Sequence, residues 1–236
     1  MSNLRLFHLG NIIENSTSLL SKEHTHYVVN VMRLKRGSNL NFFNKSGEWL
    51  SEIVFLDRDR VEVKFLDKIK EPTNTSNIEL AICLVKKTPM ETILQKATEL
   101  GVSKIVPIIS DRTEIKELNF ERANKIVIEA TEQSNQMSPP EISKVTKLKN
   151  YIEALESKIL FFADVNSSNK LEPKSFKSGI TNCILIGPEG DFSPSEREHI
   201  LKKSTVIPFS LSKNILRTDT AVISAISLVN FINNNH

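Results

Sequence analysis

The stretch that decides the fold is Ile184-Leu185-Ile186-Gly187-Pro188-Glu189-Gly190-Asp191-Phe192. It continues an apolar run from Cys183 that is typical of a buried parallel strand, and the run stops at Gly-Pro, where a tight loop must follow. Ser193 then predicts an N-cap, with Pro194 at the first helical position and Glu196 completing a capping box. A glycine-bearing loop after a buried strand is where open α/β sheets bind their ligands. An ordinary Gly-Pro turn without a ligand fits this stretch equally well.

A second segment, Leu211 to Ala221, follows an apolar strand that begins at Val206 and leads into a last helix. Asp219 is placed favourably in the first turn of this helix, because a carboxylate stabilises the positive end of the helix dipole. The apolar residues of the helix recur at helical spacing and predict one buried face. A second strand-loop-helix unit therefore follows the first.

Together, the motifs Ile186-Gly187-Pro188-Glu189-Gly190 and Ile215-Leu216-Arg217-Thr218-Asp219-Thr220-Ala221 resemble the ribosomal RNA small subunit methyltransferase E family. Its members are enzymes of the SPOUT class that use S-adenosylmethionine (SAM) to methylate N3 of a uridine in 16S rRNA. The resemblance extends from about Arg5 to Ile232. It implies an α/β fold in which a C-terminal SPOUT domain with a trefoil knot follows an N-terminal PUA-like β-barrel that holds RNA.

The chain changes character near residue 72, which predicts domains at 1–71 and 72–236. Short strands fill the first part, interrupted by one helix that we expect to begin after Ser21 and to end near Gly37. Residues 70–77 read as a linker. Beyond it strands alternate with helices, one of them opened by a predicted cap at Thr88, and this alternation predicts a parallel sheet covered on both faces. Topology rules alone predict no knot, so the knot rests on the resemblance.

Composition narrows the class of protein. The chain has 236 residues, of which 39% are hydrophobic and 25% charged, as in a soluble globular protein, and its net charge of +3 is compatible with nucleic acid. Cys83 and Cys183 lie in apolar runs and read as core residues of a reducing compartment, and no ligand spacing predicts a metal site. No apolar run approaches the roughly 20 residues that span a bilayer. We therefore expect a cytoplasmic protein.

The resemblance implies that three segments wrap the cofactor SAM in a bent conformation. Adenine requires a flat apolar slot with main-chain donors and acceptors at its edge, which the apolar residues of the last segment and their main chain can supply. The predicted cofactor residues are Ala163, Ile186, Gly187, Pro188, Glu189, Gly190, Leu211, Ile215 and Leu216.

The reaction sets its own requirement. Because uracil N3–H is weakly acidic, methyl transfer to N3 needs the anion or its incipient form. Arg217 could stabilise that anion, and Glu132 or Asp219 could accept the proton. The alternative for Arg217 is a helix-terminal residue that pairs with Asp219 or with a phosphate.

Phosphate contacts are predicted mainly on the helix of the first domain and just after it. The candidates are His24, Arg33, Lys35 and Arg36, with Arg112 in the second domain. His26 lies in the same cluster, and a solvated helix face is the alternative for all of them. The partners implied by the resemblance are 16S rRNA in the 30S subunit and a second copy of the chain, with no membrane and no metal.

Several residues depart from the family pattern. Asp191 stands where a second glycine is usual, Ser212 and Asn214 replace glycine and arginine, and Asp219 replaces glutamate. Gln136 stands where arginine is common. These departures leave open a non-catalytic RNA-binding or ribosome-assembly factor that retains the fold. A Rossmann-type nucleotide enzyme is disfavoured, because no Gly-x-Gly-x-x-Gly follows the first strand of the second domain.

Overall fold

The computed structural model describes residues 4–72, 77–156, 158–177 and 179–234. The chain forms two compact units, of which the first comprises residues 1–74 and 131–138 and the second comprises residues 75–130 and 139–236. Of the predicted linker 70–77, residue Lys70 ends a strand, and residues 73–76 lie outside the described part. The first unit is therefore built from two stretches that are far apart in the sequence.

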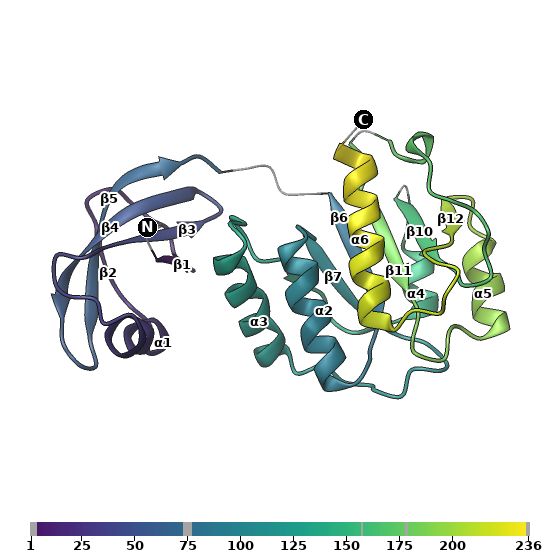
Figure 1. The fold of residues 1–236 in the computed structure, drawn as a ribbon, viewed down its shortest axis with the longest axis horizontal. Coiled ribbons are helices and arrows are strands. Elements are labelled where there is room, and N and C mark those ends of the chain that lie inside the picture. Colours follow the sequence, from purple (N-terminus) through teal and green to yellow (C-terminus); the bar gives the residue numbers. More distant parts are fainter. Residues whose placement is uncertain (1–3, 73–76, 157, 178, 235–236) are drawn as a thin grey trace. The chain divides into compact units, whose positions relative to one another are not determined.

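The first unit contains a mixed sheet in the order β1-β3-β4-β5-β2. β1 pairs in parallel with β3, and the other pairs are antiparallel. Its apolar cluster includes Leu6, Phe42, Trp49 and Phe65. The elements are β1 (Arg5–Phe7), β2 (Thr17–Leu19), α1 (Lys22–His26), the π-helix η1 (Tyr27–Val31), β3 (Asn39–Asn44), β4 (Gly47–Leu56) and β5 (Val61–Lys70) (Figure 1). The short strand β2 was not predicted.

The helical segment of this unit begins as predicted but ends early. The Ser21 hydroxyl caps α1 by accepting a hydrogen bond from the main-chain N–H of His24 at 3.1 Å. The chain leaves the helix after Val31, because Arg33 adopts a left-handed conformation with φ of 52°. The predicted end near Gly37 was therefore wrong. Gly37 also has a positive φ, but it serves the turn that leads into β3.

A buried ion pair fastens β1 to the rest of the first unit. Nε of Arg5 lies 3.0 Å from Oε2 of Glu48, whose side chain is only 1% exposed. The Arg5 guanidinium also donates to the carbonyls of Glu132 and Gln136, at 3.3 and 3.0 Å. Burial by itself would raise the pKa of the Glu48 carboxyl, but hydrogen bonds from Asn41 and Arg5 outweigh burial and hold this pKa below its ordinary value. Arg5 thus joins the sheet to the end of a distant helix.

The second unit is a parallel sheet in the order β12-β10-β11-β6-β7-β8, with β9 also paired to β7. Its strands are β6 (Ile78–Cys83), β7 (Lys104–Ile109), β8 (Glu141–Ile142), β9 (Thr146–Lys147), β10 (Ile159–Ala163), β11 (Asn182–Ile186) and β12 (Val206–Phe209). β6 and β11 are entirely buried, as expected for central strands of a parallel sheet. The two-residue strands β8 and β9 were not predicted.

Helices cover both faces of this sheet. They are α2 (Lys87–Glu99), α3 (Phe120–Gln133), α4 (Leu148–Glu153), α5 (Pro194–Leu201) and α6 (Thr218–Asn234), with the 3₁₀ turn η2 (Pro173–Ser175). Residues of α2, α3 and α6 share one apolar cluster with one sheet face, whereas α4 and α5 pack on the other. The predicted cap at Thr88 was wrong: the N-cap is Lys86, two residues earlier, and its side chain makes no capping hydrogen bond.

The last connection runs back over the sheet. β12 lies at the edge beside β10, yet α6, yellow in Figure 1, packs against α2 and β11. The chain after β12 must therefore cross the end of β10 to reach α6. The connection between β10 and β11 packs Leu171 and Phe176 into the same apolar cluster as α6. The connection from β10 to β11 therefore packs on the sheet face that α6 covers, and the connection from β12 leads to the same face.

The Arg5–Glu48 pair should dominate the stability of the first unit. We expect Arg5→Met to lower the free energy of unfolding by roughly 3 kcal/mol, because Glu48 stays buried and its remaining partners among the described residues are Lys70 and Asn41. Arg60→Met, which removes an exposed partner of Glu62, should cost much less. Urea denaturation followed by tryptophan fluorescence of Trp49 measures both.

The same pair should make stability depend on pH. Because the folded-state pKa of Glu48 is lowered, the ionised carboxylate stabilises the fold above its ordinary pKa of 4.5, and this stabilisation is lost as the pH falls through the lowered value. The gap in unfolding free energy between wild type and Glu48→Gln should therefore narrow in acid. A gap that stays constant with pH would contradict this account.

Candidate active site

Parallel pairing brings three loops to one edge of the second unit's sheet. Ala163, the last residue of β10, is in register with Phe209, the last residue of β12. On the other side of β10, Phe162 is in register with Leu185 of β11. The segments 163–169, 187–193 and 210–217 therefore leave the sheet side by side, at the carboxyl ends of their strands.

The loop after β11, residues 187–192, is tightly turned. Asp191 has φ of 60°, its N–H donates to the Pro188 carbonyl at 3.0 Å, and its own carboxylate accepts from the N–H of Phe192 at 2.8 Å. A left-handed conformation costs an L residue about 1–2 kcal/mol, and Asp tolerates it because its side chain bonds the local main chain. At Gly187 an added Cβ would lie 3.0 Å from the buried Phe192 ring, so a larger residue there would force this ring to shift.

The helix after this loop is fixed by a complete capping box, as predicted. The Ser193 hydroxyl accepts from the Glu196 N–H at 3.3 Å, and the Glu196 carboxylate accepts from the Ser193 N–H at 2.9 Å. The loop after β7 binds the same cap: Asp111 accepts from the Ser193 hydroxyl at 2.7 Å, and its N–H donates to Glu196. Arg112, a predicted RNA contact, donates to the Gly190 carbonyl at 2.7 Å. It thus holds the loop that carries the proposed cofactor contacts.

The chemistry of this edge suits SAM. Ala163, Ile186 and Leu211 belong to one apolar cluster, which can receive a flat ring. Within the described residues, the main-chain N–H groups of Glu189, Gly190 and Leu211 have no hydrogen-bond partner. These groups remain available to the polar edge of a ligand. Ile215 is 94% exposed, Leu216 is partly buried, and Pro188 is buried.

Arg217 lies at the same edge, at the start of α6. Its side chain is 77% exposed, and its Nε lies 3.6 Å from Oδ1 of Asp219. Asp219 also accepts from the N–H of Thr220 at 2.9 Å, within the first turn of the helix. The ion pair is exposed and therefore weak, so the guanidinium can turn toward another anion at little cost.

Glu132, the other predicted proton acceptor, belongs to the first unit. Its Oε1 accepts from the main-chain N–H of Phe7 at 2.8 Å and lies 3.4 Å from Nε2 of His24. A predicted proton acceptor, Glu132, and a predicted RNA contact, His24, therefore lie next to each other. The remaining predicted RNA contacts of this unit, Arg33, Lys35 and Arg36, are exposed after η1, and His26 is exposed on α1.

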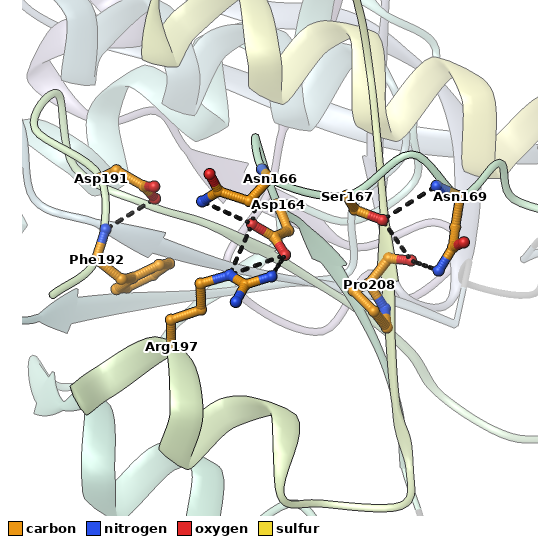
Figure 2. A network of polar contacts seen from close by, with 8 residues as sticks. All are labelled: Asp164, Asn166, Ser167, Asn169, Asp191, Phe192, Arg197 and Pro208. Carbon is orange, nitrogen blue, oxygen red and sulfur yellow. Dashed lines mark hydrogen bonds and ion pairs between the residues drawn. The ribbon is translucent and has the colours of Figure 1, made fainter. Parts of the chain in front are cut away.

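The sequence reasoning missed an ion pair that borders this edge. The carboxylate of Asp164, whose side chain is 1% exposed, receives a two-pronged contact from the Arg197 guanidinium, with Nη2 to Oδ2 at 2.7 Å (Figure 2). Burial alone would raise the pKa of Asp164, but the Arg197 and Asn166 hydrogen bonds outweigh it and lower this pKa. An aspartate directly after an apolar strand was the available signal. Its partner could not be chosen without the three-dimensional structure.

Other expectations concern what the chain lacks. Within the described ranges, no group of three or more His, Cys, Asp or Glu side chains could hold a metal ion. No helix in the described part of the chain is long and apolar enough to cross a membrane. Both cysteines are buried, and burial raises the pKa of each thiol to about 12, so neither is a reactive thiolate.

Comparison with known proteins identifies the two parts of the chain. A family model described as the RNA methyltransferase domain matches residues 71–230, and one described as the RNA methyltransferase PUA domain matches residues 20–66. The ribosomal RNA small subunit methyltransferase E of Rickettsia conorii is 33% identical over 97% of this chain and 95% of its own length. The ribosomal RNA small subunit methyltransferase E of Buchnera aphidicola subsp. Schizaphis graminum is also 33% identical, over 90% of this chain and 89% of its own length.

Solved structures agree with these matches. A ribosomal RNA small subunit methyltransferase E from Neisseria gonorrhoeae, bound to SAM, superposes with a TM-score of 0.85 at 25% identity. A Legionella pneumophila protein in complex with SAM also gives 0.85, at 27% identity. Each match covers 98% of both chains.

The fold and these matches define the chain as an RNA methyltransferase of the SPOUT class with a PUA domain before its methyltransferase domain. It belongs to the ribosomal RNA small subunit methyltransferase E family. The fold class predicted from the resemblance is confirmed as a PUA domain followed by an α/β domain of the SPOUT class, and the activity class is confirmed as SAM-dependent methylation of rRNA. The Rossmann-type enzyme, which the sequence disfavoured, is excluded.

The local hydrogen bond of Asp191 leads to a graded prediction. Asp191→Ala should lower the free energy of unfolding by about 1–2 kcal/mol, because alanine keeps the cost of a positive φ and loses the acceptor for the Phe192 N–H. Asparagine keeps a side-chain oxygen that can accept from the Phe192 N–H and also tolerates a positive φ, so Asp191→Asn should be about as stable as wild type. Glycine loses the acceptor but has no steric cost at positive φ, so the stability of Asp191→Gly should fall between those of the alanine variant and wild type. Chemical denaturation measures the series, and an alanine variant as stable as wild type would refute this reasoning.

Proposed function

We propose that the chain transfers a methyl group from SAM to N3 of a specific uridine in 16S rRNA of the small ribosomal subunit. The observation that carries this proposal is the shared edge at which Ala163, Ile186 and Leu211 belong to one apolar cluster, while the segment that Leu211 begins ends with the exposed Arg217. The family supplies the rRNA and the cofactor. The edge would supply an apolar surface for the adenine ring and a cation, Arg217, for the nucleotide.

The cofactor contacts proposed for this edge follow from its three segments. Ala163, Ile186 and Leu211 would hold the adenine, with Ile215 and Leu216 closing over it from the last segment. The main chain of residues 187–190, with unpaired N–H groups at Glu189 and Gly190, would bind its polar groups. When bound, SAM supplies the methyl group on its sulfonium.

The residues proposed for the chemistry act on the nucleotide. Arg217, freed from its weak pair with Asp219, would donate to a carbonyl oxygen of uracil and stabilise the charge that develops as N3 loses its proton. Asp219 or Glu132 would accept that proton. Both carboxylates accept main-chain hydrogen bonds, from Thr220 and from Phe7, and these bonds orient them.

Further parts of the proposal concern partners and location. Arg33, Lys35 and Arg36 of the first unit, with His24 and Arg112, would contact RNA phosphates. A homodimer involving the last helix and a location in the cytoplasm complete the proposal. A monomeric mass in light scattering, or recovery with membranes after cell fractionation, would contradict these two points.

The reaction is tested by methyl transfer from radiolabelled SAM to 30S subunits from a strain that lacks this activity, followed by nucleoside analysis. We expect label in 3-methyluridine. Label in another nucleoside would contradict the N3 assignment. Measurable SAM binding without any transfer, to free 16S rRNA or to 30S subunits, would favour the non-catalytic RNA-binding factor.

The role of Arg217 is tested by Arg217→Ala. We expect turnover to fall by about 10²–10³-fold, as when a preorganised donor to a developing anion is removed, while the dissociation constant for SAM stays near wild type. Lys213→Ala removes another exposed cation of the same loop and serves as the matched control. Loss of SAM binding in Arg217→Ala alone would instead make Arg217 a cofactor contact.

A further inference from the structure

A single buried carboxylate stands where the three segments of the proposed cofactor site meet. Asp164 directly follows Ala163 at the end of β10, and 2% of the residue is exposed. Its carboxylate accepts from Nε and Nη2 of Arg197 and from the main-chain N–H of Asn166. An ionised group at this depth is stable only when it is paired and hydrogen-bonded, and Asp164 meets both conditions.

Arg197 connects this carboxylate to the loop after β11. It lies in the first turns of α5, and its main-chain N–H donates to the Ser193 carbonyl at 2.9 Å. Ser193 carries the capping box and comes one residue after the loop that contains Gly187 and Gly190. The start of α5 is therefore fixed by the capping box, and the two hydrogen bonds from Arg197 to Asp164 hold the end of β10 against it.

An aromatic contact runs parallel to this ion pair. Phe192 at the end of the loop is buried against Phe162 of β10, with ring centroids 5.6 Å apart. Figure 2 shows Asp191 and Phe192 on one side of the Arg197 guanidinium and Asp164 on the other. The loop after β11 is thus joined to β10 by one apolar and one ionic contact.

The segment after β10 is in turn bonded to the end of β12. The Asp164 N–H donates to the Phe209 carbonyl at 3.0 Å, and the Ser210 N–H donates to the Asn169 carbonyl at 2.8 Å. The Ser167 hydroxyl and the Asn169 amide both reach the Pro208 carbonyl, at 3.4 and 3.5 Å (Figure 2). Leu211, a proposed adenine contact, follows directly. All three segments are therefore linked through Asp164 and its neighbours.

We propose that Asp164 and Arg197 are positioning residues for the SAM site, holding the segments after β10, β11 and β12 in the arrangement that binds the cofactor. This inference rests on the function proposed above. Neither side chain needs to touch the cofactor for the pair to act. Weakening it lets the loop after β11 and the segment 164–169 move independently, which lowers the population of the binding arrangement.

The two partners differ in how they tolerate loss of the other. Arg197 has a side chain that is 36% exposed, so water can solvate its charge when Asp164 becomes neutral. Asp164 has no such access and would keep an unpaired charge if Arg197 were removed. Asp164→Asn is therefore milder than removal of the Arg197 charge would be, and Arg197→Lys is milder still because it retains the charge and loses only the two-pronged fork.

The test uses the full chain with Asp164→Asn, Arg197→Lys and the control Glu198→Gln. The control removes an exposed carboxylate from the same helix, which forms an ion pair with Lys202 at 2.9 Å. Calorimetric titration with SAM should show a dissociation constant raised by about tenfold to 100-fold in Asp164→Asn, since small misplacements far from the reacting atoms have effects of that size. Arg197→Lys should lie between it and wild type, and the control should match wild type.

A second readout separates positioning from general damage. At saturating SAM and 30S subunits, kcat of both pair variants should approach wild type, because bound cofactor restores the arrangement. Circular dichroism melting, with titrations run below each transition, ensures that folded protein is compared. Folded Asp164→Asn and Arg197→Lys proteins with wild-type SAM affinity would overturn the positioning role. A wild-type chain that binds no SAM would instead overturn the proposed function itself, and the inference with it.

Discussion

Parallel strand pairing is the constraint on which the second unit depends. It forces β10, β11 and β12 to end at one edge, so that segments separated by more than twenty residues in sequence leave the sheet together. As a consequence, apolar side chains meet there with main-chain N–H groups that have no hydrogen-bond partner among the residues that the structure describes. The glycines and the capping box then decide how tightly the middle loop can turn.

The sequence predicted those parts of the molecule whose causes are local. The apolar run that ends at Ile186 and the capping box at Ser193 appear where expected, because strand burial and helix capping depend on a few neighbouring residues. The early end of the first helix was missed because Gly37 is the stronger cap signal. Arg33 took the left-handed position instead, without a glycine.

Features that depend on distant contacts could not be predicted in this way. Nothing near Asp164 indicates that its partner is Arg197, 33 residues further along the chain. The placement of β12 beside β10, and the return of α6 to β11, likewise depend on topology that the strand and helix pattern does not contain. The expectation of a knot rested on the family resemblance alone. Site residues were inferred from matching motifs, whereas the polar contacts that support them required coordinates.

The hydrogen bonds between β1 and residues 132–136 affect the order in which the chain folds during synthesis. Its residue Phe7 donates to Glu132, 125 positions later, and Arg5 binds carbonyls up to Gln136. When the ribosome has released only the first sheet, the buried Glu48 already has Arg5, but Arg5 lacks the carbonyl acceptors of residues 132 and 136. The N-terminal unit therefore reaches its complete set of contacts only after most of the α2 and α3 region has emerged, so its maturation is tied to that of the methyltransferase domain rather than preceding it.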